Sequence, residues 1–156
     1  FYEGGSSVEV PLDEVTTHLY VYEQTLSLQL DPDRVEGHES MRITHAGGAW
    51  CGMGVHWDAA RDLTGWTTLH LSARSSDSAF TTFEVGMNDA GGTAKVRASD
   101  YGFVADGAWH TLAIPLADLA AAGLDVTGVA APFVFLAGAG AGGSSLLLDA
   151  VYVTAN

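Results

Sequence analysis

The sequence predicts an all-β fold, specifically a two-sheet antiparallel β-sandwich of jelly-roll type with one short connecting helix. Runs that alternate apolar and polar residues, rich in Val, Thr and aromatic residues, recur along almost the whole chain. Clusters of Gly, Asp and Ser separate these runs and supply the backbone angles that chain reversals need. Many short strands with a single helix pack most economically as two layered sheets.

Each element follows from its local pattern. The strands are predicted, with boundaries good to about 2–4 residues, at 17–23, 25–31, 39–45, 50–57, 67–74, 80–88, 93–98, 109–114, 128–136 and 145–153. The stretch LADLAAAG at 116–123 is expected to form the helix, because Gly123 can end it after about two turns. The 156 residues suit one domain, so 1–156 is predicted to be a single module, with 1–16 either an extra edge strand or a linker remnant.

The charge of the chain excludes some partners. There are 19 acidic residues against 6 Lys and Arg, which gives a net charge of −13. A nucleic-acid backbone or an anionic membrane surface would repel such a chain. Cys51 is the only cysteine, so no disulfide can form within the chain. The start at Phe1, without a basic and then apolar leader, favours a piece of a larger protein.

The sequence does not favour catalysis. His56, His70 and Glu84 could meet on neighbouring strands, but the chain has no Ser-His-Asp order, paired histidine ligands or nucleophile elbow. The glycine-rich segment at 138–143 is not followed by the Lys-Ser/Thr pair of a phosphate-binding loop. A small enzyme is therefore the least favoured interpretation of the sequence.

Polar side chains mark a candidate ligand-binding face. The period of two along a strand sends apolar residues inward and polar residues outward in the runs at 69–74, 83–88 and 94–98. If these strands are adjacent, they present one face of hydrogen-bond donors and acceptors. The candidates on this face are His70, Arg74, Glu84, Asn88 and Arg97. A solvated face with no ligand gives the same pattern, so that alternative stays open.

Aromatic residues add stacking surfaces, because the C–H face of a sugar ring packs on an aromatic plane. Trp50 and Trp57 bracket one predicted strand, and Tyr101 lies in a glycine-containing loop. Strand parity sends Trp57 into the core unless a bulge at a glycine between the two tryptophans resets the phase. We therefore expect Trp50 to be the stacking platform, with His56 beside the polar set and Tyr101 as a further contact.

Several motifs follow one another in a distinctive order. They are YVYE at 20–23, EGHESMRI at 36–43, WCG at 50–52, DLTGWTTL at 62–69, GAWHTLAIPLADL at 107–119 and LLLDAVYV at 146–153. In order and spacing they resemble the jelly-roll carbohydrate-binding modules akin to families four, eleven, twenty-two and thirty.

The resemblance implies a structural calcium ion where the first and last strands meet. Its ligands would be the side chains of Glu23 and Asp149, with a carboxylate or carbonyl groups near Glu36 and Gly37. Calcium takes about six to eight oxygen ligands, which suits this set. The alternative that these are ordinary surface acids stays open.

The N-terminal stretch departs from the resemblance, because residues 1–16 have no counterpart in the motifs. Glu3 or Asp31 could therefore replace one of the calcium ligands named above.

The resemblance also implies a function. We expect a non-catalytic carbohydrate-binding module that targets an attached enzyme to a polysaccharide, namely a β-glucan or a related plant or algal glycan. Its partners would be the polysaccharide and a covalently attached glycoside hydrolase or lyase domain, with neither nucleic acid nor membrane. The expected location is secreted or at the cell surface. The alternative function is a structural or adhesive β-sandwich domain of a multidomain surface protein.

Overall fold

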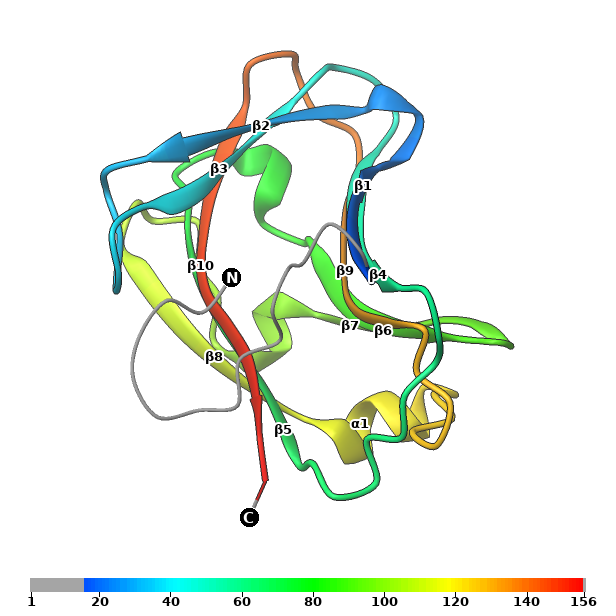
Figure 1. The fold of residues 1–156 in the computed structure, drawn as a ribbon. Coiled ribbons are helices and arrows are strands. Elements are labelled where there is room, and N and C mark those ends of the chain that lie inside the picture. Colours follow the sequence, from blue (N-terminus) through cyan, green and yellow to red (C-terminus); the bar gives the residue numbers. More distant parts are fainter. Residues whose placement is uncertain (1–15, 156) are drawn as a thin grey trace.

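The computed structural model describes residues 16–155, which form two five-stranded antiparallel sheets that pack face to face (Figure 1). In spatial order, sheet A contains β1 (Thr17–Val21), β4 (Cys51–Trp57), β9 (Ala131–Ala137), β6 (Glu84–Asp89) and β7 (Gly92–Arg97). Sheet B contains β2 (Leu26–Asp31), β3 (Ser40–His45), β10 (Ser145–Thr154), β5 (Thr68–Arg74) and β8 (Trp109–Pro115). The predicted β-sandwich is confirmed. The predicted edge strand or linker at 1–16 lies almost wholly outside the described residues.

Short helices occupy the connections. The helix α1 (Leu116–Ala121) follows β8 directly, close to its predicted place. It ends before Gly123, whose φ of 110° lies in the left-handed region that glycine adopts without strain. The single-turn 3-10 helices are η1 (Tyr22–Gln24), η2 (Ser78–Phe80) and η3 (Ala98–Tyr101). Within residues 16–155, no helix has the length and apolar character needed to cross a membrane.

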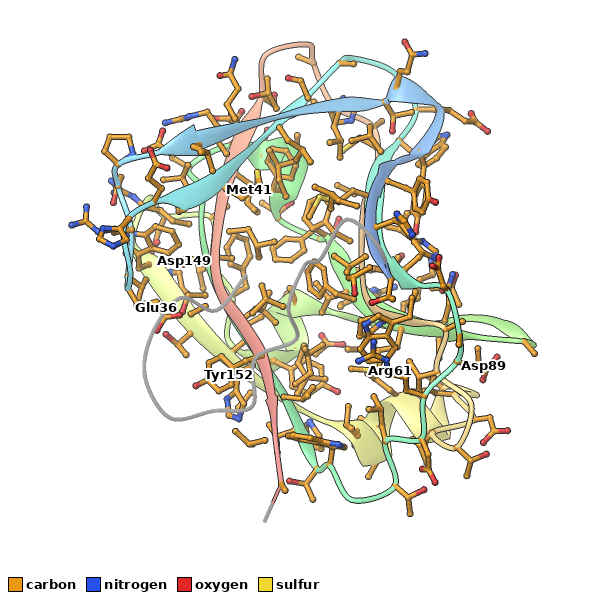
Figure 2. The ribbon with its side chains drawn as sticks, in the orientation of Figure 1. Glu36, Met41, Arg61, Asp89, Asp149 and Tyr152 are labelled. Atoms are coloured by element: carbon orange, nitrogen blue, oxygen red, sulfur yellow. The ribbon has the colours of Figure 1, made fainter. Side chains whose placement is uncertain are left out.

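The core lies between the two sheets, where the inward side chains of both meet (Figure 2). Phe80, Phe83 and Phe135 are fully buried there. The rings of Phe83 and Phe135 have centroids 5.3 Å apart, and Phe103 meets Phe83 edge-on at 4.7 Å. Ring pairs at these separations stabilise beyond the area they bury. Phe135 lies on β9 and the other three rings lie in connections beside sheet A, so this cluster forms the sheet A side of the core.

The chain changes sheets between β1 and β2. Glu23 and Gln24 in η1 both have positive φ, at 50° and 56°, so the strand predicted at 17–23 ends instead at Val21. A positive φ is uncommon for residues other than glycine. This tight turn places Glu23 just before the N-terminal end of β2.

One predicted neighbourhood is wrong. The strands expected at 67–74 and 80–88 are not adjacent, because β5 pairs with β8 and β10 in sheet B. Strand β6 pairs with β7 and β9 in sheet A, as expected for β6 and β7. The connection through η2 crosses from one sheet to the other. Alternation within a strand determines which face a side chain takes, but not which strand lies beside it.

Candidate functional site

The outer face of sheet A is built from the alternation along β4. Its inward residues, among them Met53, Val55 and Trp57, are buried in the core. Gly52, Gly54 and His56 therefore point away from the core, to the outer face. Two of these three outward positions carry no side chain, which opens space above β4.

Four aromatic side chains gather over this space. We call Tyr20, Tyr22, Trp50 and His56 the aromatic row. The rings of Tyr20 and Tyr22 each meet the His56 ring edge-on, with centroids 5.3 Å and 6.0 Å away. The hydroxyl of Tyr22 also forms a hydrogen bond of 2.9 Å with Nε2 of His56. Tyr20 stays 51% exposed, so its ring is available to a ligand.

The two glycines are required by the aromatic row. A Cβ placed on Gly54 would lie 2.0 Å from the hydroxyl oxygen of Tyr22 and 2.7 Å from Nε2 of His56. A Cβ on Gly52 would lie 2.5 Å from a methyl carbon of Leu136 and 3.1 Å from the Trp50 ring. Real Cβ atoms essentially never come within 3.0 Å of such atoms, so a Cβ at Gly54 would displace Tyr22 or His56, and one at Gly52 would displace Leu136. Glycine at both positions therefore leaves room above β4 for the side chains of Tyr22 and Trp50.

The hydrogen bond between Tyr22 and His56 joins two neutral groups near neutral pH. Partial burial lowers the pKa of His56 and raises the pKa of Tyr22, because it disfavours the charged form of each. On the other sheet, burial also lowers the pKa of His70.

We therefore expect the thermal stability to rise from about pH 5 to about pH 7.5. Both histidines have a folded-state pKa below their ordinary value of 6.5. The unfolded chain then binds more protons as pH falls, so stability is complete above that value and is lost as pH falls through the folded pKa. Melting temperatures of the parent and of His56→Asn and His70→Asn variants measure this. Parallel pH profiles for all three proteins would show that neither His56 nor His70 causes the pH dependence of stability.

The other edge of this outer face, over β6 and β7, carries charge. Glu84 on β6 forms an ion pair of 2.6 Å with Lys95 on β7, and Arg97 stands opposite Glu84 in the strand register. We call these three residues the ionic row. Leu136 on β9 lies between the two rows, in register with Gly52 on one side and Glu84 on the other. At roughly 4.8 Å between strands, the five strands make a face about 19 Å wide.

This face can bind a chain of sugar rings. Aromatic planes stack on the C–H faces of sugars, and carboxylate, ammonium and guanidinium groups form hydrogen bonds with the hydroxyl groups. The aromatic row offers the first kind of contact and the ionic row offers the second. The two kinds lie on one surface, as a linear ligand across the strands requires.

The predicted site residues divide between the two sheets. Trp50, His56, Glu84, Asn88 and Arg97 belong to β4, β6, β7 and their flanks in sheet A. His70 and Arg74 belong to β5 in sheet B, so the expectation that all of these share one face is wrong.

The structure also shows where Trp57 and Tyr101 lie. Trp57 is buried, as strand parity predicts, and no bulge resets the phase of β4. The hydroxyl of Tyr101 donates a 2.8 Å hydrogen bond to Asp118, and burial with the Asp118 carboxylate raises the pKa of Tyr101 to about 12. Tyr101 thus links η3 to α1 and does not belong to the aromatic row.

The sequence analysis missed Tyr20 and Tyr22 as site residues. The signal for them was present, because a Tyr-x-Tyr pair and a Gly-x-Gly pair each put both members on one strand face. A strand with two outward glycines needs neighbouring side chains to cover it. Only the pairing of β1 with β4 shows that the tyrosines do so.

The predicted calcium ligands come together only in part. Asp149 and Glu36 lie side by side (Figure 2), with Oδ2 of Asp149 accepting hydrogen bonds from the backbone N–H of Val35 and Glu36 at 2.6 Å and 3.1 Å. Glu23 lies beyond the opposite end of β2, a strand about 20 Å long. Among residues 16–155, no three His, Cys, Asp or Glu side chains converge as a metal cluster. Of the predicted ligand side chains, Glu36 and Asp149 therefore lie together and Glu23 does not, while Glu3 lies outside the described residues.

Calcium binding stays a prediction with a direct test. A ligand that binds only the folded state at 100 times its Kd stabilises it by about 2.7 kcal/mol. We expect the melting temperature to be several degrees higher in millimolar calcium than after exhaustive chelation. Glu23→Gln should leave this difference unchanged, because Glu23 is remote from Asp149. Superimposed melting curves would rule out a structural calcium.

Comparisons with known proteins identify the family and the fold. A family model described as carbohydrate binding domain 30 matches residues 4–155. The family 30 carbohydrate-binding module of the cellulosomal cellulase Cel9D-Cel44B of Clostridium thermocellum superposes with a TM-score of 0.70 at 18% identity, covering 91% of this chain and 92% of that chain. No curated protein sequence matches the chain.

Two further solved structures share the fold. The family 11 module from Clostridium thermocellum, in complex with a β-1,3-1,4-mixed-linked tetrasaccharide, gives a TM-score of 0.61 at 13% identity and covers 95% of this chain and 94% of that one. The extra C-terminal domain of the exo-1,3/1,4-β-glucanase ExoP from a Pseudoalteromonas species gives 0.62 at 16% identity, covering 89% and 84%. The resemblance to jelly-roll carbohydrate-binding modules is confirmed. The chain belongs to the carbohydrate binding domain 30 family and is a non-catalytic carbohydrate-binding module.

Proposed function

We propose that the outer face of sheet A binds a single β-linked glucan chain that lies across the strands. The observation that carries this proposal is the aromatic row over Gly52 and Gly54, with the ionic row on the same face. Uncovered aromatic planes at one edge and paired charges at the other suit a ligand that has both C–H faces and hydroxyl groups.

The ligand is neutral and extended. The chain carries a net charge of −13, so an acidic polysaccharide would be repelled. A face about 19 Å wide that runs across five strands suits a linear chain of sugar rings. The tetrasaccharide bound by the family 11 module is of this β-linked kind, which supports the proposal.

The role is to hold an attached enzyme at its polysaccharide. Tethering turns the encounter of enzyme and substrate into an event at high effective concentration, without any catalytic group on the module. The solved neighbours include a module of a cellulase and a domain of a glucanase, which supports an attached catalytic domain here. A protein with this role acts where the polysaccharide is, so we place it outside the cell or at its surface.

Trp50→Ala tests the face. We expect it to weaken binding to mixed-linkage β-glucan by about 1–3 kcal/mol, or roughly 5- to 150-fold, because a stacking plane is lost. Calorimetry with the folded variant measures the change. Leu30→Ala is the matched control, since it removes an exposed apolar side chain from sheet B. Unchanged affinity in Trp50→Ala would remove Trp50 from the site.

A panel of soluble polysaccharides tests the class of ligand. We expect saturable binding to mixed-linkage β-glucan or another neutral β-glucan, and none to polyuronates. An adhesive or structural domain, the alternative function, would bind no member of the panel. That result would contradict the proposed function.

A further inference from the structure

A second candidate site lies on the outer face of sheet B, away from the aromatic row. A pocket of about 190 Å³ opens at the ends of β3, β5 and β10. Its walls include Asp33, Arg42, Arg74, Asp77 and Ser145, and Leu147 contributes an apolar surface.

The two arginines of the pocket are held in place by their neighbours. Arg74 donates to the carbonyl oxygen of Gly107 at 2.6 Å and to the Asp33 carboxylate. Arg42 donates to the Asp31 carboxylate and, through Nη1, to the Ser145 hydroxyl at 3.2 Å. An arginine has five N–H donors, and the described residues use two from Arg74 and three from Arg42. Each guanidinium therefore keeps donors for a ligand.

The two carboxylates are positioned in the same way. Asp33 accepts a 3.0 Å hydrogen bond from the indole N–H of Trp109 as well as the bond from Arg74. Asp77 accepts a 2.9 Å hydrogen bond from the backbone N–H of Ser145 through Oδ2. Fixed donors and acceptors lower the cost of ordering a binding site when a ligand arrives.

The charge around the pocket disfavours an anionic ligand. Asp31 and Asp33 each neutralise one arginine, so the pocket does not attract an anion as two free guanidinium groups would. Asp77 adds a negative charge beside them, and the whole chain carries −13. Because both arginines are paired with carboxylates, Asp77 contributes the uncompensated charge of these walls. A neutral ligand rich in hydroxyl groups uses both the donors and the acceptors of these walls.

The volume sets the size of the ligand. Sites for drug-sized molecules span roughly 300–1,000 Å³, so a pocket of about 190 Å³ takes a smaller molecule. We propose that this pocket binds the ring of one neutral sugar residue, whose hydroxyl groups meet the Arg74, Asp33 and Asp77 side chains while a C–H face lies toward Leu147. The proposal does not depend on glucan binding at sheet A, because the two sites lie on opposite sheets.

The test is a nuclear magnetic resonance titration of the labelled chain with D-glucose, D-xylose or D-galactose. At least one of these sugars should shift the backbone amides of Ser75, Ser76 and Asp77 in a saturable way, and more strongly than D-glucuronate does. The amides of Gly52 and Gly54 report separately on sheet A, where a cello-oligosaccharide is the probe. Failure of glucan binding at sheet A is thereby distinguished from failure at the pocket.

A blocking variant makes the test specific. Ser76 is exposed and lines the pocket, so Ser76→Phe should fill it without disturbing the core and should weaken monosaccharide binding at least about tenfold. Ser78→Phe is the matched control, because Ser78 is exposed nearby but does not line the pocket. If none of the three sugars shifts the pocket amides, if D-glucuronate binds more tightly, or if Ser76→Phe binds like Ser78→Phe, the proposal is overturned.

Discussion

Replacement of Trp57 by alanine is expected to lower the free energy of unfolding by about 3–5 kcal/mol, because it leaves a cavity that the core cannot fill. Trp57 is only 7% exposed and packs in the main core cluster. The guanidinium carbon of Arg61 lies 4.4 Å from the centre of the Trp57 ring, so a cation–π contact is lost as well. Since domains have only about 5–15 kcal/mol of stability, this loss would remove a large share of the total.

Denaturant titration followed by circular dichroism measures this loss. Trp66→Ala is the comparison, since Trp66 is only partly buried and should cost less. Trp57→Phe should also cost less than Trp57→Ala, because it keeps an aromatic ring under Arg61. A loss below about 1 kcal/mol in Trp57→Ala, the range of a surface substitution, would show that the ring does not support the core.

Substitution of Gly54 by alanine is expected to weaken glucan binding at least about tenfold, which corresponds to about 1.4 kcal/mol. The new Cβ would fall 2.0 Å from the Tyr22 hydroxyl oxygen, so the Tyr22 side chain must swing away. That movement breaks the Tyr22–His56 hydrogen bond and spoils the aromatic row, while the core behind β4 is untouched. Calorimetry against the glucan that binds the parent measures the effect.

Gly65→Ala is the matched control for this substitution. A Cβ at Gly65 meets no atom within 4 Å, and the residue precedes β5 in sheet B. Gly65→Ala should bind like the parent. If Gly54→Ala also binds like the parent and its spectrum shows a displaced Tyr22, then the aromatic row does not contact the glucan.

The sequence predicted the strands well because a strand buried on one face alternates apolar and polar residues with a period of two. Phe83, Val85 and Met87 were expected to face the core, and all three are fully buried. The alternation cannot show which strands pair. For that reason Arg74 was expected beside Glu84, although the two residues lie on different sheets.

The aromatic row was predicted only at Trp50 and His56. Tyr22 opens η1 directly after β1, and the chain then turns through the positive φ of Glu23 and Gln24. Neither residue is a glycine or asparagine, so the sequence carries no sign of such a turn. The same turn separates Glu23 from Asp149, which the motif order alone could not reveal.

The central position of β10 in sheet B determines when this sheet can finish folding. This last strand lies between β3 and β5, and its Asp149 binds the backbone of residues more than a hundred positions earlier. Contacts that distant in sequence slow folding, because a long loop must close before they form. During synthesis the ribosome therefore releases β3 and β5 with open edges, and sheet B closes only after β10 has emerged. Until then these edges can pair with other chains, so early pairing with β10 protects the module from aggregation.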